Sequence, residues 1–369
     1  MAYLELRDLE RDFGTVKALD GVNVELAQGE FLSLLGPSGC GKTTALRLVA
    51  GFDRPDGGSI VVDGKDITHV APNKRDMGMV FQAYSLFPNM TAAQNVEFGL
   101  RIRGRHRADR QKRVGELLEL VGLGSAGDRY PYQLSGGMQQ RIALARALAI
   151  EPRVLLLDEP LSALDAKVRV QLREEIRRIQ LELGITTLYV THDQEEALSV
   201  SDHVAVMYRG RIEQMGAPAE MYSAPATPFV AEFIGTMNRL EATVVDGGSG
   251  AVEHGGVRLN VEAARGRRTG ERILVLIRPE TVDVAPANGD GGENVLGGEV
   301  LTQTFLGPVT RLKVVGPGTD LIADVSTAKA ASLPVGTRVT ATLPAGDARI
   351  LELSDSLPET AEEPALGGR

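Results

Sequence analysis

The sequence has little cysteine and no long apolar run, and both shortages restrict what the protein can be. Cys40 is the only cysteine among 369 residues, so no internal disulfide framework can form, and we expect a reducing, cytosolic compartment. No apolar run approaches the ~18 residues that a membrane-spanning helix needs. The first residues, Met1–Phe13, alternate charged and apolar side chains and lack the continuous apolar stretch of an export signal. A role at a membrane would therefore depend on partners.

Positive charge is also in short supply. The chain carries 40 Lys and Arg against 49 Asp and Glu, which gives a formal net charge of −9. The electrostatic field of such a molecule repels nucleic acid phosphates. The basic run Arg101–Arg107 lacks interleaved aromatic residues and is interpreted as a solvated surface. We expect no nucleic acid partner.

Two regions differ in their residue pattern, and the change comes near Gly235. Before that residue, short apolar runs typical of buried strands alternate with helical patterns, which predicts an α/β domain over 1–235. In Lys167–Leu183 the apolar residues fall on one face at helical spacing. The strands expected in this domain are Phe31–Leu35, Met77–Phe81, Val154–Asp158, Thr186–Val190 and His203–Tyr208.

Beyond Gly235, helical periodicity fades and glycine clusters separate short β-prone runs. This spacing predicts a small all-β barrel over 236–354. The acidic tail, 355–369, is rich in Pro and Ala and is expected to be disordered. The candidate strands of the second domain are Glu241–Val245, Val257–Val261, Ile273–Ile277, Gly298–Thr304, Val309–Val315, Leu321–Val325, Val339–Leu343 and Ile350–Leu353.

The segment from Gly36 to Thr43 predicts a phosphate site. It matches G-x-x-x-x-G-K-[ST] in full and lies between an apolar strand and a helix. Backbone N–H groups of such a loop, and the start of the helix, point at phosphate oxygens. Lys42 is expected to reach the β- and γ-phosphates of ATP, and the Thr43 hydroxyl to bind Mg²⁺. The residues assigned to the nucleotide are Gly36, Pro37, Ser38, Gly39, Cys40, Gly41, Lys42, Thr43 and Thr44.

Cys40 occupies a variable position of this motif. A thiol near a helix N-terminus tends toward a lowered pKa. The cysteine is interpreted as merely tolerated there, and we expect its alkylation to be slowed by ATP.

An acidic pair at a strand end, Asp158 and Glu159, supplies the second half of the phosphate site. Asp158 ends the apolar run that begins at Val154 and is expected to hold Mg²⁺ through water. Glu159 lies one residue farther on, where a carboxylate can polarise the water that attacks the γ-phosphorus. With the P-loop, this pair predicts hydrolysis of ATP.

The run Leu134–Gln140, which reads Leu-Ser-Gly-Gly-Met-Gln-Gln, distinguishes among P-loop proteins. It resembles the signature sequence of ABC-transporter ATP-binding subunits, and other landmarks of that family follow in order. Gln82 resembles the Q-loop glutamine, Ser162–Asp165 resembles the D-loop, and His192 resembles the switch histidine. Phe13 stands where the family places an aromatic ring under adenine. The resemblance implies an α/β P-loop NTPase cassette with a helical subdomain.

The signature also has a chemistry that can be interpreted without the family. Ser135, with Gly136 and Gly137 at a helix start, presents a hydroxyl and bare N–H groups to an anion. One chain rarely needs two phosphate-binding surfaces for one γ-phosphate, and the resemblance implies a head-to-tail homodimer in which Ser135 closes over the partner's nucleotide. A glycine turn before an ordinary helix is the alternative. The resemblance adds Gln82, Gln139 and Asp165 to the nucleotide contacts, places Mg²⁺ at Thr43, Gln82 and Asp158, and assigns catalysis to Glu159, His192, Lys42 and Gln82.

His192 taken alone would be interpreted as a structural or surface histidine. Its place after an apolar strand favours the edge of the sheet where the phosphates bind, and Asp193 with Glu196 predicts a capping box at the next helix. The segment Ala83–Asn89, which follows Gln82, is expected to move. In the family this loop senses both the γ-phosphate and the membrane partner.

The second half of the chain resembles a β-rich accessory domain, the OB-like or TOBE-like barrel of importer ATPases. The likeness spans about Leu240–Leu353 and includes Arg278-Pro279-Glu280. The junction Phe233–Asn238 resembles the polyamine and ferric-iron branch more than the sugar branch. The resemblance implies a peripheral subunit on the cytoplasmic side of the membrane that couples ATP hydrolysis to uptake.

The implied partners are two integral membrane permeases and an extracytoplasmic solute-binding protein. The solute expected is a polyamine such as spermidine or putrescine, with sugar, ferric iron and phosphonate as alternatives. A soluble ABC ATPase of repair or translation is less favoured, because this chain has one compact cassette without a long insertion between Thr43 and Asp158. A P-loop kinase passing phosphate to a small molecule needs neither the signature nor His192.

Overall fold

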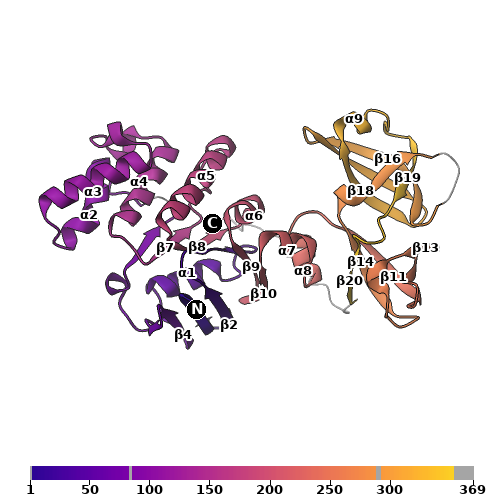
Figure 1. Cartoon of the computed structure of the whole chain (residues 1–369), viewed down its shortest axis with the longest axis horizontal. Coiled ribbons are helices and arrows are strands. Elements are labelled where there is room, and N and C mark those ends of the chain that lie inside the picture. The colour runs from indigo at the N-terminus through magenta and orange to yellow at the C-terminus, as the bar shows by residue number, and fades with distance from the viewer. Residues whose placement is uncertain (1, 83–84, 288–291, 353–369) are drawn as a thin grey trace, which may run out of the picture. The chain divides into compact units, whose positions relative to one another are not determined.

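The chain folds as two compact units, Met1–Ser223 and Ala224–Arg369 (Figure 1). The computed structural model describes residues 2–82, 85–287 and 292–352. The division between the units falls before the predicted boundary at Gly235. The short helix α7 (Pro218–Ser223) ends the first unit, and α8 (Pro228–Phe233) lies near the start of the second. The boundaries at 235 and 354 stay predictions, and the predicted tail lies outside the described residues.

The first unit is built on a six-stranded sheet in the order β10-β9-β3-β8-β7-β6. Its five inner and edge strands from β9 to β6 run parallel, while β10 pairs antiparallel with β9. Strands β3 and β8 are buried along their whole length, as expected for a parallel sheet covered on both faces. The strands are β3 Phe31–Leu35, β6 Met77–Val80, β7 Val154–Asp158, β8 Thr186–Thr191, β9 His203–Tyr208 and β10 Arg211–Gly216.

A second, antiparallel sheet of the same unit was not predicted from the sequence. Its four strands have the order β2-β1-β4-β5. Charged residues interrupt the apolar ones along β1 and β2, and these strands are only partly buried. They therefore lack the continuous apolar runs that mark the buried parallel strands. They are β1 Leu4–Phe13, β2 Val16–Leu26, β4 Gly57–Val62 and β5 Lys65–Asp66.

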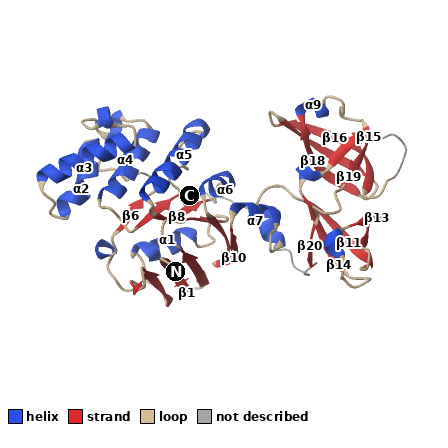
Figure 2. Cartoon of the chain, viewed as in Figure 1, coloured by secondary structure: helices blue, strands red, loops and turns tan. Residues whose placement is uncertain are grey.

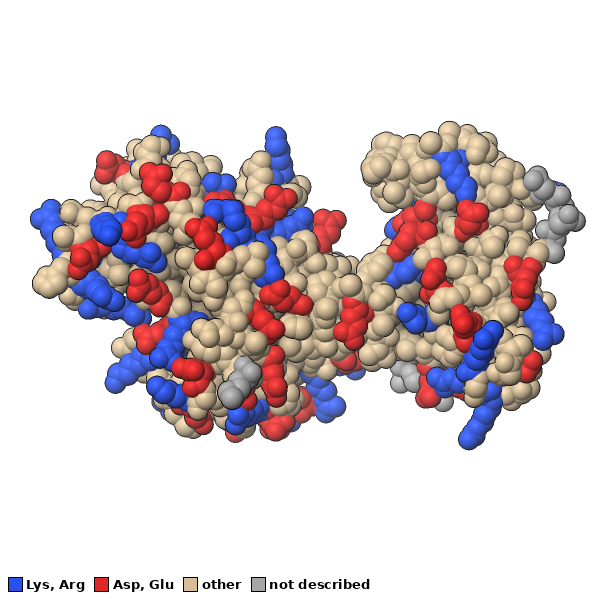
Figure 3. Space-filling model, in the orientation of Figure 1, with Lys and Arg blue, Asp and Glu red and all other residues tan. Residues whose placement is uncertain are grey.

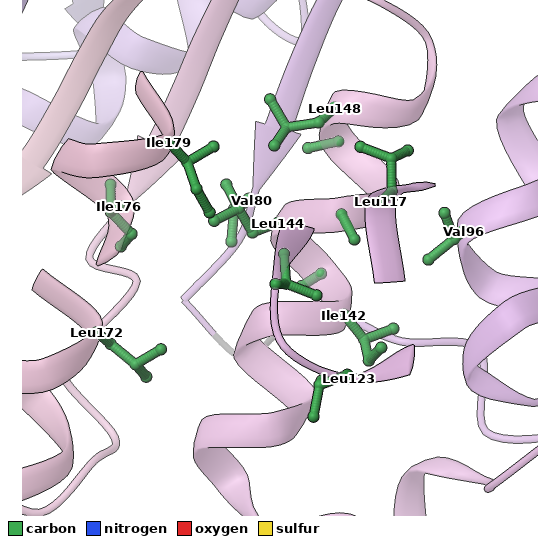
Figure 4. Close-up of a cluster of buried hydrophobic side chains, with 14 of the residues drawn as sticks. Val80, Val96, Leu117, Leu123, Ile142, Leu144, Leu148, Leu172, Ile176 and Ile179 are labelled. Atoms are coloured by element: carbon green, nitrogen blue, oxygen red, sulfur yellow. The ribbon is translucent and has the colours of Figure 1, made fainter. Parts of the chain in front are cut away.

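Helices complete the first unit (Figure 2). A helical region between β6 and β7 packs on a large apolar cluster with the sheet and α5, and Figure 4 shows leucine, isoleucine and valine side chains from these elements converging there. This confirms the predicted α/β cassette with a helical subdomain. The helices are α1 Lys42–Ala50, α2 Ala92–Ile102, α3 Arg107–Leu120, α4 Gly136–Ala149, α5 Ala166–Leu183 and α6 Gln194–Val200, with 3₁₀ turns at Pro72–Lys74, Gly124–Ala126 and Pro131–Gln133.

The second unit consists of two five-stranded antiparallel sheets that share one apolar core. The first has the order β13-β12-β11-β14-β20 and the second β15-β19-β16-β17-β18. This confirms the predicted β-rich, barrel-type domain. The elements are β11 Asn238–Asp246, β12 Ala251–His254, β13 Val257–Asn260, β14 Arg272–Ile277, β15 Asp283–Pro286, β16 Val295–Phe305, β17 Val309–Gly316, β18 Thr319–Ser326, β19 Arg338–Thr342, β20 Arg349–Glu352, the short helix α9 Thr327–Ala330, and 3₁₀ turns at Glu262–Ala264 and Pro279–Thr281.

Membrane-spanning helices were not expected from the sequence. Across residues 2–82, 85–287 and 292–352, the structure holds no helix that combines the length and the apolar character needed to cross a bilayer. The basic run Arg101–Arg107 is exposed throughout, as a solvated surface requires. Figure 3 shows Lys and Arg mixed with Asp and Glu over this face of the first unit.

Candidate functional site

The P-loop joins the end of β3 to α1 and is closely packed against neighbouring backbone. Gly41 has φ 108°, and a Cβ there would lie 2.4 Å from the Ala18 carbonyl oxygen. Gly36 has φ 156°, and a Cβ there would lie 2.3 Å from the carbonyl oxygen of Met207. Any side chain at either position would clash, so glycine is required for the loop to take this path.

The Lys42 side chain is hydrogen-bonded to the backbone at the start of this loop. Its side chain is buried, and its Nζ donates to the carbonyl oxygens of Gly36 at 2.7 Å and Pro37 at 2.9 Å. A buried ammonium with fixed carbonyl partners presents a positive charge at one place, next to the N-terminal end of α1. This arrangement suits an anion with several oxygens, such as a polyphosphate.

The two predicted halves of the phosphate site meet directly. Thr43 Oγ1 donates to Asp158 Oδ1 at 3.2 Å. Thr43 follows β3 and Asp158 ends β7, and both strands pair in parallel with β8 between them. The carboxyl ends of parallel strands therefore bring together residues that are far apart in the chain.

Burial raises the pKa of Asp158 above its ordinary value. The hydrogen bond from Thr43 opposes this rise, and the neighbouring Glu159 carboxylate adds to it. A hydroxyl and a carboxylate oxygen are the hard ligands that Mg²⁺ prefers, so the residues present fit that ion. In the described part of the chain, no cluster of three or more His, Cys, Asp or Glu could hold a metal by itself. Phosphate oxygens would have to complete such a site.

Glu159 is the point where three sheet-edge segments meet. Its Oε2 accepts a hydrogen bond from Gln82 Nε2 at 3.1 Å and lies 3.3 Å from Nδ1 of His192. Gln82 follows β6, Glu159 follows β7 and His192 follows β8. Glu159 has a left-handed backbone, φ 41°, and its N–H donates to the carbonyl of Val190 at 2.9 Å. A strained position that anchors a carboxylate between two polar side chains is typical of a functional site.

The expected capping box at α6 is half right. Asp193 caps the helix, since its Oδ1 accepts from the N–H groups of Glu195 and Glu196. The Glu196 side chain does not return to Asp193: it is buried and accepts from Tyr189 Oη and Thr191 Oγ1, both at 2.7 Å. The buried hydroxyls on β8 satisfy this carboxylate, so the second half of the prediction was wrong.

The signature residues lie at the start of α4, as expected. Ser135 is exposed and its Oγ accepts from the N–H of Met138 at 3.4 Å. Gln139 Nε2 donates to the carbonyls of Pro131 and Leu134. Among the described residues, no hydrogen bond joins Ser135, Gly136 or Gly137 to the P-loop. One chain therefore does not bring its own signature into contact with its own phosphate site.

Two further predicted residues have, among the residues that the structure describes, local partners only. Asp165 caps α5 by accepting from the N–H of Val168 at 3.0 Å. Phe13 is half exposed at the end of β1, with the Arg11 guanidinium carbon 4.6 Å from the ring centroid. Their contacts with a nucleotide stay predictions.

Cys40 differs from its expectation. Its side chain is buried, and burial raises the pKa of the thiol; the nearby Lys42 ammonium opposes the rise without reversing it. The Sγ lies 3.7 Å from Lys42 Nζ. The predicted lowered pKa was wrong, because loss of hydration outweighs the positive end of the helix.

Sequence reasoning missed the residues that hold the segment after Gln82. Ala83 and the next residue lie outside the described residues, but the remainder is anchored by Asn95, which is fully buried. Its amide accepts from the N–H of Phe87 at 2.8 Å and donates to the carbonyls of Phe87, Met90 and Thr91. An asparagine on the apolar face of an otherwise regular helix was the available signal.

A second missed residue is Arg146 of α4, which donates to the carbonyl of Ser85 at 2.7 Å. Its guanidinium lies 5.6 Å from the ring centroid of Phe87. Burial lowers the pKa of this arginine. The helix that begins at the signature is thus linked to the segment after Gln82.

Residues 19–162 match the family model described as ABC transporter, and residues 275–351 match the TOBE domain. The sulfate/thiosulfate import ATP-binding protein CysA 2 of Chromobacterium violaceum is 53% identical over 312 residues, covering 85% of this chain and 84% of that protein. The spermidine/putrescine import ATP-binding protein PotA of Nitrosospira multiformis is 47% identical over 315 residues, covering 84% and 86%.

A third import ATP-binding protein and one solved structure are also similar to this chain. The Fe(3+) ions import ATP-binding protein FbpC 2 of Rhizobium meliloti is 47% identical over 340 residues, covering 88% of this chain and 85% of that protein. A solved dimeric structure of the ATP-binding cassette MJ0796, in a post-hydrolysis state bound to ADP and Pi, is 33% identical with a TM-score of 0.53. It covers 58% of this chain and 98% of that chain.

Proposed function

The chain belongs to the ABC transporter family, among its import ATP-binding proteins, and we propose that the residues meeting at Glu159 are those with which it hydrolyses ATP. ATPase activity and ATP binding are properties of this family. The single observation that carries the residue assignment is the convergence of Gln82 and His192 on Glu159 Oε2, beside the bonded pair Thr43 and Asp158.

In the proposed reaction, Lys42 and the P-loop N–H groups hold the β- and γ-phosphates. Glu159 accepts a proton from the water molecule whose oxygen attacks the γ-phosphorus, as the bond to the β-γ bridging oxygen breaks and ADP leaves. His192 donates a hydrogen bond to the γ-phosphate, and Gln82 orients the Glu159 carboxylate. Thr43 and Asp158 would hold Mg²⁺, and the bound ion would neutralise part of the phosphate charge.

The second copy of the chain is part of this proposal. Ser135 is exposed and makes no hydrogen bond to the P-loop of its own chain within the described residues. The related solved cassette is a dimer bound to ADP and Pi. Both observations support a head-to-tail homodimer in which Ser135, Gly136, Gly137 and Gln139 of one copy close over the ATP of the other.

The membrane assignment follows from the names of the relatives. Those proteins are import ATP-binding proteins, and we propose that this chain acts with two membrane permeases on the cytoplasmic side of the membrane, with an extracytoplasmic solute-binding protein in the same system.

The solute we propose is a polyamine, on the likeness of the 233–238 junction and the PotA relatives. Sulfate/thiosulfate, named in the 53% relative, was not among the expected solutes and becomes an alternative beside ferric iron. Purifying the chain in complex with its permeases, adding the solute-binding protein and measuring which of the three solutes stimulates ATP hydrolysis would decide among them.

The residue assignment is tested with Glu159→Gln. The amide keeps the size of the side chain and the contact with Gln82 but cannot accept a proton. We expect kcat for phosphate release to fall by about a hundredfold or more, with ATP affinity retained and ATP-dependent dimerisation enhanced. Phosphate release at the wild-type rate would refute Glu159 as the base.

A further inference from the structure

Arg169 lies near the start of α5, and its guanidinium contacts two loops that border the ATP site. Nη2 donates to the carbonyl of Leu164 at 3.2 Å, within the D-loop, Ser162–Asp165. Nη1 donates to Asp193 Oδ2 at 3.1 Å. Asp193 directly follows His192, and we name these two residues the histidine loop. One side chain therefore spans from the D-loop to the histidine loop.

The two carboxylate oxygens of Asp193 have separate tasks. Oδ1 accepts from the N–H groups of Glu195 and Glu196 and so caps α6, while Oδ2 is bound by Arg169. The Asp193 and Arg169 side chains are 25% and 31% exposed. At that exposure the ion pair by itself contributes little to stability, but the planar fork of arginine fixes the direction of each hydrogen bond. The contact with Arg169 therefore fixes the Asp193 side chain, which caps the start of α6.

Glu196 ties the same helix start to the sheet. Its buried carboxylate accepts from Tyr189 Oη and Thr191 Oγ1 on β8. Arg169 Nε lies 3.8 Å from Glu196 Oε1, which is too long for a hydrogen bond but close enough for charge attraction. In the part of the chain that the structure describes, Arg169 is the only cationic side chain within 4.0 Å of this carboxylate.

The D-loop, which Arg169 contacts at Leu164, is hydrogen-bonded to Glu159. Both the N–H and the Oγ of Ser162 donate to the carbonyl of Glu159, and the N–H of Leu164 donates to the carbonyl of Leu161. Glu159 is itself anchored to Val190 of β8. Because this turn is closed by its own hydrogen bonds, holding the Leu164 carbonyl also restricts the turn that carries Glu159.

We propose that Arg169 is a positioning residue that holds the D-loop and the histidine loop in one arrangement, so that His192 stays beside Glu159 during hydrolysis. The inference rests on the proposed function, since it needs those two residues in their assigned roles. Arg169 acts through them and does not contact the nucleotide. Arginine suits this task because its donors bind a carbonyl and a carboxylate in fixed directions at once, which the single ammonium of lysine does less well.

The first test is Arg169→Gln, compared with Arg178→Gln on the same helix. Arg178 also pairs with a carboxylate, Glu182, and also donates to a carbonyl, that of Leu120, but it lies away from both loops. We expect Arg169→Gln to lower kcat about tenfold with the KM for ATP unchanged within about twofold. The control should keep kcat within about twofold of wild type, and Arg169→Lys should recover part of the loss. Equal kcat losses in the two glutamine variants would overturn the proposal.

The second test asks whether Arg169 acts through His192. When His192→Ala is already present, adding Arg169→Gln should lower kcat by a further factor of less than about two, since the residue that Arg169 positions is already absent. Independent, fully multiplying losses would indicate a general structural role and would overturn the proposal.

The closing experiment does not depend on ATP hydrolysis. Amide hydrogen exchange of the nucleotide-free chain should be faster in Arg169→Gln than in wild type over both 161–166 and 191–197, with Arg178→Gln unchanged in both segments. Unchanged exchange over 191–197 would overturn the link between the loops. A wild-type chain without ATPase activity would instead refute the proposed function, and the exchange result would still decide whether Arg169 joins the loops.

Discussion

The P-loop half of the cassette and its signature half differ in how many of their polar groups are bound within one chain. Lys42, Thr43, Glu159 and His192 all have partners inside the site, and those partners come from several strands. Within the described part of the chain, Ser135 makes only the cap hydrogen bond of its own helix, and it is exposed to solvent. The difference indicates that one half is assembled by folding, whereas the other half exposes its donors to solvent, as the proposed homodimer requires.

The largest expected effect comes from separating the two halves. Lys42→Ala should lower ATP affinity about a hundredfold, and Ser135→Arg should abolish turnover while leaving nucleotide binding to the P-loop intact. Mixing the two variants should restore activity to about a quarter of wild type, because half of the dimers are mixed and each holds one complete site of two. Phosphate release is the measurement. Mixed dimers that form without any recovery would contradict the composite site.

The next largest effect is on stability: removing a supporting arginine should lower the free energy of unfolding more in the P-loop half than in the signature half. The buried Arg75 guanidinium donates to the carbonyls of Leu48 and Val49 at the end of α1 and also to Thr68 and Val70. Arg75→Met leaves these acceptors without a donor, and we expect about 3 kcal/mol lower free energy of unfolding.

The matched change in the signature half is Arg141→Met. This arginine on α4 is less buried; it donates to the carbonyl of Val121 and pairs with Glu175. Its loss should cost about 1 kcal/mol in urea unfolding. Equal losses for the two variants would contradict the view that the P-loop helix is the more firmly fixed of the two.

The third prediction concerns pH. The pKa of Asp158 is raised in the folded chain, mainly by burial, so folding favours its protonated form. That contribution is fully present below the unfolded pKa and is lost as the pH rises through the folded pKa. At neutral pH, Asp158→Asn should therefore raise the thermal midpoint of the nucleotide-free chain slightly. The gain should vanish near pH 3.5, a value about at the ordinary pKa of aspartate.

Glu175 provides the control for that measurement. Burial also raises its pKa, but the Arg141 guanidinium opposes the rise. Glu175→Gln removes the partner of Arg141, so it should not stabilise the chain at neutral pH. A stabilised Glu175→Gln, or an Asp158→Asn gain that persists at low pH, would contradict this account.

The smallest effect concerns Cys40 inside the P-loop half. Its buried thiol, with a raised pKa, should react slowly with iodoacetamide at pH 7 and several-fold faster at pH 9. ATP should slow the reaction further. Mass spectrometry of the single labelled peptide measures both rates, with a cysteine introduced at the exposed Ser135 as the reference for the signature half. Equal rates at the two positions would refute the buried placement of Cys40.

Much of this molecule could be predicted because its signals are local. Buried parallel strands are nearly continuous apolar runs, and the expected strands Phe31–Leu35, Val154–Asp158 and His203–Tyr208 match the structure residue for residue. The P-loop was recognised from eight consecutive residues. The antiparallel strands β1 and β2 were missed because they are half exposed, with irregular register between Leu6 and Asp12.

The residues that support the site could not be predicted in the same way. Arg75, Arg146 and Arg169 bind backbone carbonyls or a carboxylate distant in the chain, and no short motif marks them. Asn95 binds carbonyls four to eight residues before it, and no short motif marks it either. Glu196 shows the opposite error, since a local capping pattern predicted a contact that buried hydroxyls on β8 replaced.

The sequence by itself determined the P-loop motif, the acidic strand end and the order of the family landmarks, because each depends on residues adjacent along the chain. Only the tertiary structure decided that Gln82 and His192 meet at one oxygen of Glu159, that Cys40 is buried with a raised pKa, and that Arg169 spans two loops. These outcomes depend on strand order and on desolvation, and neither can be obtained from neighbouring residues alone.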